Sequence, residues 1–94
     1  MQLKHTPGPW LREGRTVYTL SDKGVNHFYL RVEADPRTCS AEEAEATAMV
    51  ITAAPDMVQA LLDVEADHMA LYGDEDVPVL MVVRAALKKA GVRK

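Results

Sequence analysis

Apolar and polar residues alternate before residue 35, and a different spacing follows residue 40. In residues 25–34 apolar and polar residues take alternate positions. The apolar positions are Phe28, Leu30, Val32 and Ala34, and the positions between them are His27, Tyr29, Arg31 and Glu33. One apolar and one polar face predict a half-buried β-strand. After Ser40 the apolar residues recur every three or four positions, which predicts helices. The chain therefore changes from strand to helix between Asp35 and Ser40.

Two more strands are predicted upstream of this one. Thr16–Ser21 is rich in β-branched and aromatic residues, which favour strands. Trp10–Glu13 precedes it across a Gly14-Arg15 turn, and Asp22-Lys23-Gly24 supplies the next turn, because glycine tolerates positive φ. The three strands are expected to form an antiparallel meander with one face open to solvent or to a partner.

An extended arm leads into the first strand. The arm, His5-Thr6-Pro7-Gly8-Pro9-Trp10, contains two prolines, which fix φ and remove amide donors, so it cannot be helical. Trp10 is the single tryptophan of the chain. It either belongs to a recognition surface or anchors the arm to the helices, and an anchor is the commoner role of one tryptophan in a small domain.

Three helices are predicted after residue 40, namely Ala41–Ala54, Asp56–Tyr72 and Val77–Ala90. Ser40 and Glu43 form a capping box at the start of the first helix, in which each side chain bonds the other residue's amide. Asp76 is the expected cap of the third helix, and Gly91 is expected to end it. Pro55 either kinks one continuous helix or separates two.

Each helix is expected to bury one apolar face. The inward positions are Ala46, Met49, Val50 and Ala53 in the first helix, Met57, Leu61, Val64, His68 and Leu71 in the second, and Val79, Leu80, Val83, Ala86, Leu87 and Ala90 in the third. The predicted fold class is α+β with the order βββααα. Residues 1–94 are expected to form a single domain, with a meander and its arm at 5–34 and a helical part at 40–91.

The length and composition fit a small soluble protein. A domain near this size buries roughly 60–65% of the surface of its unfolded chain, so dimerisation is one route to further stability. No apolar run approaches the ~20 residues that cross a bilayer, and the first residues lack the apolar core of a signal peptide. The single cysteine, Cys39, cannot form an internal disulfide, which suits a reducing compartment. We therefore expect a cytoplasmic protein with no membrane partner.

Charge is distributed unevenly, although the net charge is only −3. Residues 35–76 hold eleven Asp/Glu and one Lys/Arg, whereas residues 77–94 hold five Lys/Arg and no acid. Such separation creates local fields that the net charge conceals.

No catalytic or metal-binding pattern is evident in the sequence. His5, His27 and His68 lack the spacing of a zinc site, and His68 falls on a helix seam, where a hydrogen-bonded core histidine is expected. Cys39 precedes a helix cap, where the helix dipole lowers a thiol pKa, but no histidine partner can be assigned to it, so a plain, partly buried thiol is expected. We expect no enzymatic activity, no cofactor and no metal.

Two blocks of the chain resemble a known family. His5-Thr6-Pro7-Gly8-Pro9-Trp10 resembles the opening of a group of small bacteriophage and prophage proteins, and Glu43–Leu62 is similar to their central helix, including its Ala-Ala-Pro-Asp sequence. Thr47 stands where asparagine is usual, and Met49 stands where arginine is common. The resemblance covers residues 5–62. It implies a phage accessory protein and carries over no catalytic residues.

Small phage proteins often act by binding, so a host protein complex is the expected partner. The first hypothesis is inhibition of a host defence system, such as a CRISPR effector, by protein–protein contact. There are two groups of candidate partner-binding residues. One group is Trp10, Arg12, Tyr29 and Arg31, and the other is Asp63, Glu65, Asp67, Asp74, Glu75 and Asp76 of the acidic segment. That segment is either a solvated face with a capping loop or a mimic of nucleic-acid phosphates.

Two alternatives stay open. In the first, an oligomer sequesters a signalling nucleotide, with Arg12, Arg15 and Arg31 holding phosphates and Tyr29 stacking a base. In the second, the basic C-terminal residues contact DNA weakly, although no nucleic-acid-binding motif accompanies them and direct DNA binding is the less favoured hypothesis.

Overall fold

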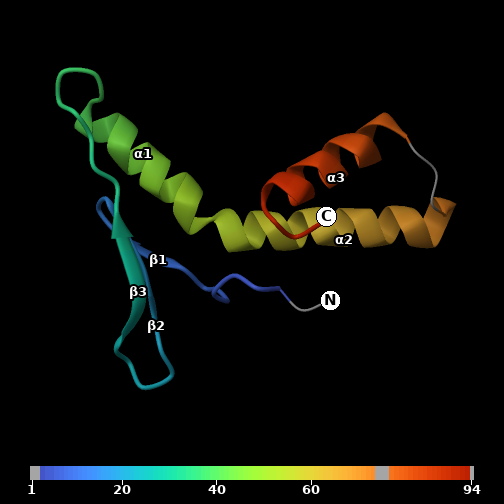
Figure 1. Cartoon of the computed structure of the whole chain (residues 1–94), viewed down its shortest axis with the longest axis horizontal. Coiled ribbons are helices and arrows are strands. Elements are labelled where there is room, and N and C mark those ends of the chain that lie inside the picture. The colour runs from blue at the N-terminus through green and yellow to red at the C-terminus, as the bar shows by residue number, and fades with distance from the viewer. Residues whose placement is uncertain (1–2, 74–76, 94) are drawn as a thin grey trace. The chain divides into compact units, whose positions relative to one another are not determined.

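The computed structural model describes residues 3–73 and 77–93, and its elements follow the predicted order (Figure 1). They are β1 (Leu11–Glu13), β2 (Thr16–Leu20), β3 (Asn26–Arg31), α1 (Ala41–Thr52), α2 (Ala54–Tyr72) and α3 (Pro78–Lys89). The protein is therefore α+β with the order βββααα. It divides into two compact units, Pro7–Pro55 and Met1–Thr6 with Asp56–Lys94, which we call the sheet unit and the hairpin unit.

The sheet is an antiparallel meander in the order β1-β2-β3. Val17 of β2 faces Arg12 of β1 and Leu30 of β3, while Tyr18 faces Leu11 and Tyr29. Side chains that face each other across antiparallel strands lie on the same side of a sheet. The register therefore assigns alternate residues to an inner and an outer face, as the alternation in residues 25–34 predicts.

The inner face of the sheet unit is closed by small residues of α1. Val17, Ala44 and Ala48 are fully buried, and α1 contacts β1 and β2. The predicted inward face of α1 is wrong, since Met49 is 56% and Val50 is 61% exposed. Alanines one helical turn apart let the helix backbone approach the sheet closely, whereas the larger Met49 and Val50 side chains face solvent.

The arm is fastened to the sheet. The Thr19 hydroxyl donates to the Pro9 carbonyl over 3.2 Å, and the Trp10 ring packs edge-on against Phe28 of β3 with centroids 5.2 Å apart. Trp10 was expected to anchor the arm to helices, whereas the ring contact that the structure shows is with a strand.

The predictions for the Ser40 cap and for Pro55 concern the two ends of α1. The Ser40 hydroxyl accepts a hydrogen bond from the Glu43 amide, which confirms that half of the capping box. Helix α1 ends at Thr52, and Pro55 lies in the first turn of α2, where its missing amide hydrogen removes no helical bond. Pro55 thus belongs to the start of a second helix.

The hairpin unit buries Leu80, Val83 and Leu87 of α3. These three positions were predicted correctly, but Val79 is 60% exposed and Ala86 and Ala90 are exposed as well. Pro78 begins α3 after Val77, which offers no side-chain cap. The predicted cap, Asp76, lies outside the described residues.

The predicted seam of α2 is largely exposed. Met57, Val64 and Leu71 are 44%, 47% and 74% exposed, whereas Glu65 is 4% exposed.

In the described chain no single helix is long and apolar enough to cross a membrane, although α1 and α2 taken together would meet that criterion.

Leu87→Ala should destabilise the hairpin unit by about 2–5 kcal/mol, because Leu87 is fully buried and the shorter side chain leaves a cavity. Met81→Ala in the same helix should change the free energy of unfolding by less than about 0.5 kcal/mol, because Met81 is 59% exposed. Urea unfolding followed by circular dichroism measures both. Equal losses in the two variants would contradict the packing described above.

Candidate functional site

The outer face of the sheet presents apolar and aromatic side chains to solvent. Leu11, Tyr18 and Tyr29 form one row across the three strands, on the side opposite Val17. Tyr29 is 69% exposed, and Leu20 at the end of β2 is 46% exposed. Tyrosine and leucine at these exposures form a surface suited to another protein, because aromatic residues are enriched at such interfaces.

A shallow pocket lies in this outer face. Its volume is about 420 Å³, and it is lined by Glu13, Thr16, Tyr18, Leu20, Asn26 and Tyr29. The lining combines two phenol rings and a leucine with one carboxylate and one amide. An apolar or basic side chain from a partner suits this composition better than a phosphate group does, because Glu13 would repel the phosphate.

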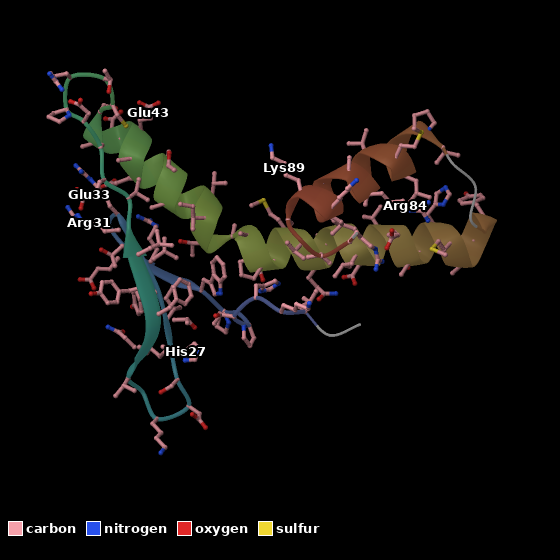
Figure 2. The ribbon with its side chains drawn as sticks, viewed as in Figure 1. His27, Arg31, Glu33, Glu43, Arg84 and Lys89 are labelled. Atoms are coloured by element: carbon pink, nitrogen blue, oxygen red, sulfur yellow. The ribbon has the colours of Figure 1, made fainter. Side chains whose placement is uncertain are left out.

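The register separates the arginines that were predicted to act together. Arg31 lies on the outer face with Tyr29 and pairs with Glu33, Nε to Oε1, at 3.3 Å (Figure 2). Arg12 faces Val17 and therefore lies on the other face, where its guanidinium donates to the Gly14 carbonyl at 2.9 Å. The sheet thus brings Tyr29 and Arg31 together and leaves Arg12 apart from them.

The third sheet arginine lies outside the strands. Arg15 falls in the β1–β2 turn, where its carbonyl accepts from the Val32 amide at 2.9 Å. This backbone bond extends the strand pairing by one step beyond β3. The side chain of Arg15 acts electrostatically on Cys39, so its charge is felt near the start of α1.

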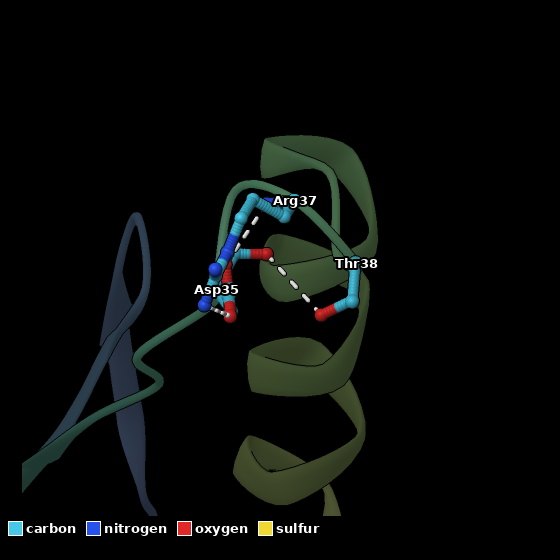
Figure 3. Close-up of polar contacts among 3 residues, drawn as sticks. All are labelled: Asp35, Arg37 and Thr38. Carbon is cyan, nitrogen blue, oxygen red and sulfur yellow. Dashed lines mark hydrogen bonds and ion pairs between the residues drawn. The ribbon is translucent and has the colours of Figure 1, made fainter.

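A polar turn connects the sheet to α1. The Asp35 carboxylate accepts hydrogen bonds from the Arg37 amide and from its guanidinium, and the Thr38 hydroxyl approaches the Asp35 carbonyl (Figure 3). The Arg37 side chain is the main cause that lowers the pKa of Asp35. All three residues are exposed, so the turn stabilises a connection and encloses no site.

The surroundings of Cys39 favour the protonated thiol over the thiolate. Its thiol is half-buried, and its pKa is raised, chiefly by a hydrogen bond to the Glu43 carboxylate and then by burial. Arg15 lowers the thiol pKa by a smaller amount. The helix-dipole effect that would favour a thiolate is therefore outweighed by the carboxylate beside it.

The histidines serve different roles. His27 is exposed in β3, as expected, and His68 is half-buried beside Tyr72, with ring centroids 5.3 Å apart. The Nδ1 atom of His68 is buried without a hydrogen-bond partner among the described residues, so the expected hydrogen bond is not seen at that atom. The residues that the structure describes contain no group of three His, Cys, Asp or Glu that could hold a metal ion.

A buried ion-pair cluster lies in the hairpin unit. Glu65 of α2 accepts from Arg84 of α3 at 3.2 Å and also from Arg93 beyond the end of that helix. The Glu65 side chain is only 5% exposed, whereas those of Arg84 and Arg93 are 32% and 35% exposed. Two guanidinium groups thus compensate one buried carboxylate, which would otherwise be very costly to desolvate.

This cluster corrects the prediction for the acidic segment. Glu65 points into the hairpin and is therefore not part of the exposed acidic surface. Asp63 and Asp67 are exposed and do belong to it. Asp74, Glu75 and Asp76 lie outside the described residues. The pairing was hard to foresee because Arg84 and Arg93 are 19 and 28 positions away, but Glu65 does share a helical face with Leu61 and Leu62.

A second pocket adjoins the same cluster. It has a volume of about 460 Å³ and is lined by Glu65, Met69, Arg84, Ala85, Lys88 and Arg93. Arg84 also reaches the Met69 sulfur at 3.8 Å. Residues of α2, α3 and the C-terminal segment therefore converge on one side of the hairpin.

Comparison with known proteins gives one family. The family described as Salmonella phage P22 protein Y8K6 matches residues 1–94. No curated protein and no solved structure matches the chain.

The hairpin unit should lose stability in acid. Arg93 is the main cause that lowers the pKa of Glu65 below its ordinary value of 4.5. The stabilisation is complete above that value and is lost as the pH falls through the lower folded-state pKa. Melting temperatures between pH 7 and pH 2 should therefore fall most steeply in the acidic part of the range.

Glu65→Gln tests the source of this pH dependence. It should cost about 1–3 kcal/mol at pH 7, because two guanidinium groups lose their carboxylate, and its stability should vary less below pH 4.5. Glu45→Gln, at an exposed position of α1 outside the hairpin unit, is the control and should keep the wild-type profile. A Glu65→Gln profile parallel to the wild type would contradict this assignment.

Cys39 should react slowly with iodoacetamide at pH 8, because the raised pKa keeps most of the thiol protonated. Removing the carboxylate with Glu43→Gln should speed alkylation by about two- to fivefold. Glu45→Gln, on the same helix, should leave the rate unchanged. Mass spectrometry of timed samples gives these rates. An unchanged rate in Glu43→Gln would contradict the assignment of the raised thiol pKa to the Glu43 carboxylate.

Proposed function

Because the chain belongs to the family of the Salmonella phage P22 protein Y8K6, we propose that it is a phage accessory protein that binds a host protein complex. We further propose that the bound complex is part of a host defence system, such as a CRISPR effector, and that the protein inhibits it by contact. The outer face of the sheet is the observation that carries the proposed contact.

That face has the properties of a binding surface. Leu11, Leu20 and Tyr29 are 38%, 46% and 69% exposed around a shallow pocket. The pocket offers a partner side chain a place to insert beside Tyr18 and Tyr29, and anchoring residues of this kind contribute most of an interface's affinity. Arg31 and Glu33 continue β3 beyond the aromatic row, where charged residues suit the polar rim of an interface.

The sheet supports protein binding better than the acidic segment does. Withdrawal of Glu65 into the hairpin leaves Asp63 and Asp67 as the exposed acids of α2 beyond its first turn. In the part of the segment that the structure describes, the acid nearest the middle of α2 is thus engaged within the hairpin and is not available to a partner.

The nucleotide and DNA alternatives receive less support. A nucleotide held by the sheet would need Arg12 on the same face as Tyr29 and Arg31, but the register places Arg12 opposite. A DNA contact would use the basic C-terminal residues, among which Arg93 is paired with Glu65. We also propose that the protein is not an enzyme, because Glu65 is engaged by Arg84 and Arg93 and the Cys39 thiol is held beside the Glu43 carboxylate.

Affinity purification of the tagged chain from the lysate of a phage-sensitive host should recover one stoichiometric host protein complex. Tyr29→Ala should weaken its binding by about 30-fold, because truncation of an interface anchor costs about 2 kcal/mol. Val50→Ala is the matched control, since Val50 is 61% exposed on α1, away from the sheet face.

A plaque assay on isogenic hosts with and without the recovered defence system tests the consequence. Expression of the chain should restore plaque formation only where the system is present, and Tyr29→Ala should lose the effect. Recovery of no complex, equal binding by Tyr29→Ala, or equal plating on both hosts would overturn the proposal.

A further inference from the structure

The exposed seam of α2 has the spacing of a helix-packing surface. Met57, Leu61, Val64, His68 and Leu71 recur in alternate steps of four and three residues, the heptad spacing by which helices pair side by side. Yet Met57, Val64 and Leu71 are 44–74% exposed. The helix therefore carries two faces, one closed by Glu65 against α3 and a second that α3 does not cover.

Helix α3 repeats this arrangement. Val79, Val82 and Ala86 each precede one of its buried residues by one position, just as Val64 precedes Glu65 in α2. Val79 and Val82 are 60% and 69% exposed. One position corresponds to a rotation of about 100°, so each helix exposes apolar residues on the same flank of its buried stripe.

The pocket shows how the flanks of the two helices are related. In α3, Arg84 and Lys88 each come one position after a buried residue. In α2, Met69 comes one position after the half-buried His68. All three side chains line the same pocket. The positions that follow the buried stripes thus share one side of the hairpin. The positions that precede them must share the other side, because antiparallel helices turn in opposite senses when viewed from one end.

One side of the hairpin thus carries Arg84 and Lys88 beside Met69, and the other side carries a row of exposed apolar residues. We call the apolar side the hairpin face, and its exposed members are Met57, Val64, Leu71, Val79, Val82 and Ala86. Two adjacent helices with such a face lack a second layer, and packed layers are the usual way in which helical units close their core.

Charge complementarity selects the occupant of this face. Beside this face α2 carries the exposed Asp63 and Asp67, one position before and three positions after Val64, and α3 carries Lys89, three positions after Ala86. Arg84 and Lys88 belong to the pocket side. Lys89 points away from α2 of its own chain (Figure 2). A second copy offers both signs in matching positions, because a twofold axis sets the acidic helix of each copy against the basic helix of the other.

We propose that two copies of the chain pair through the hairpin face to form a four-helix bundle, with α2 of each copy against α3 of the other. The pairing buries the aliphatic seam and places the exposed aspartates of α2 beside Lys89 of α3. It uses no residue of the outer sheet face, and it does not depend on the proposed function. The dimer would present two sheet faces to a host complex.

Sedimentation velocity of the full chain across a concentration series should show reversible dimerisation. Val64→Glu and Val79→Glu should each weaken the dimer by at least about tenfold, because each buries a carboxylate in the seam. Ala66→Glu and Met81→Glu are matched controls. They lie two positions further along the same helices, on the opposite side, and are exposed. The controls should dimerise as the wild type does, and circular dichroism should show all four variants folded.

A charge exchange tests the proposed pairing directly. Lys89→Glu should weaken the dimer, and Asp63→Lys should weaken it as well, while an equimolar mixture of the two variants should recover part of the lost association. A wild-type chain that stays monomeric at every concentration would overturn the proposal. Equal dissociation of the Glu variants and their controls would also overturn it.

Purification of the host complex with Val64→Glu separates this inference from the proposed function. Loss of the dimer with retention of the host complex supports two independent surfaces. Loss of the host complex with retention of the dimer contradicts the hairpin face as the dimer interface. In that case the face is covered by the host protein.

Discussion

The buried carboxylate of Glu65 is the constraint on which the helical half of the molecule depends. An ionised carboxylate that is nearly withdrawn from water is tolerated only with close partners, and Arg84 and Arg93 supply them from α3 and from the segment after it. This requirement sets which flank of α2 faces α3 and draws the C-terminal residues back over the hairpin. It also determines that the aliphatic seam of α2 remains on the outside.

Small size explains why so much apolar surface stays exposed. A chain of 94 residues in two compact units has little interior in which to place its many aliphatic side chains. Alanines close the sheet unit, and three residues of α3 form most of the buried apolar set of the hairpin unit. The surplus collects on the outer face of the sheet and on the hairpin face, and contiguous apolar surface of this kind marks interaction sites.

The two surfaces differ in character, which suits them to different partners. The sheet face mixes tyrosines with charged and amide groups, as interfaces between separately folded proteins do. The hairpin face is aliphatic and follows a heptad spacing, as permanent helix–helix contacts do. The proposed dimer and the proposed host contact therefore use separate surfaces of the molecule.

Local patterns in the sequence were enough to predict every element and its type. Alternation identified the outward Tyr29 and Arg31, the Ser40 cap located the start of α1, and heptad spacing identified the α2 seam, because each depends on residues a few positions apart. Tertiary structure alone decided that Ala44 and Ala48 close the sheet, that Arg12 lies apart from Tyr29, and that Glu65 turns inward and the seam outward. Those outcomes depend on strand register and on charges 19 and 28 positions away, and one chain's local pattern carries no information about which distant groups will meet.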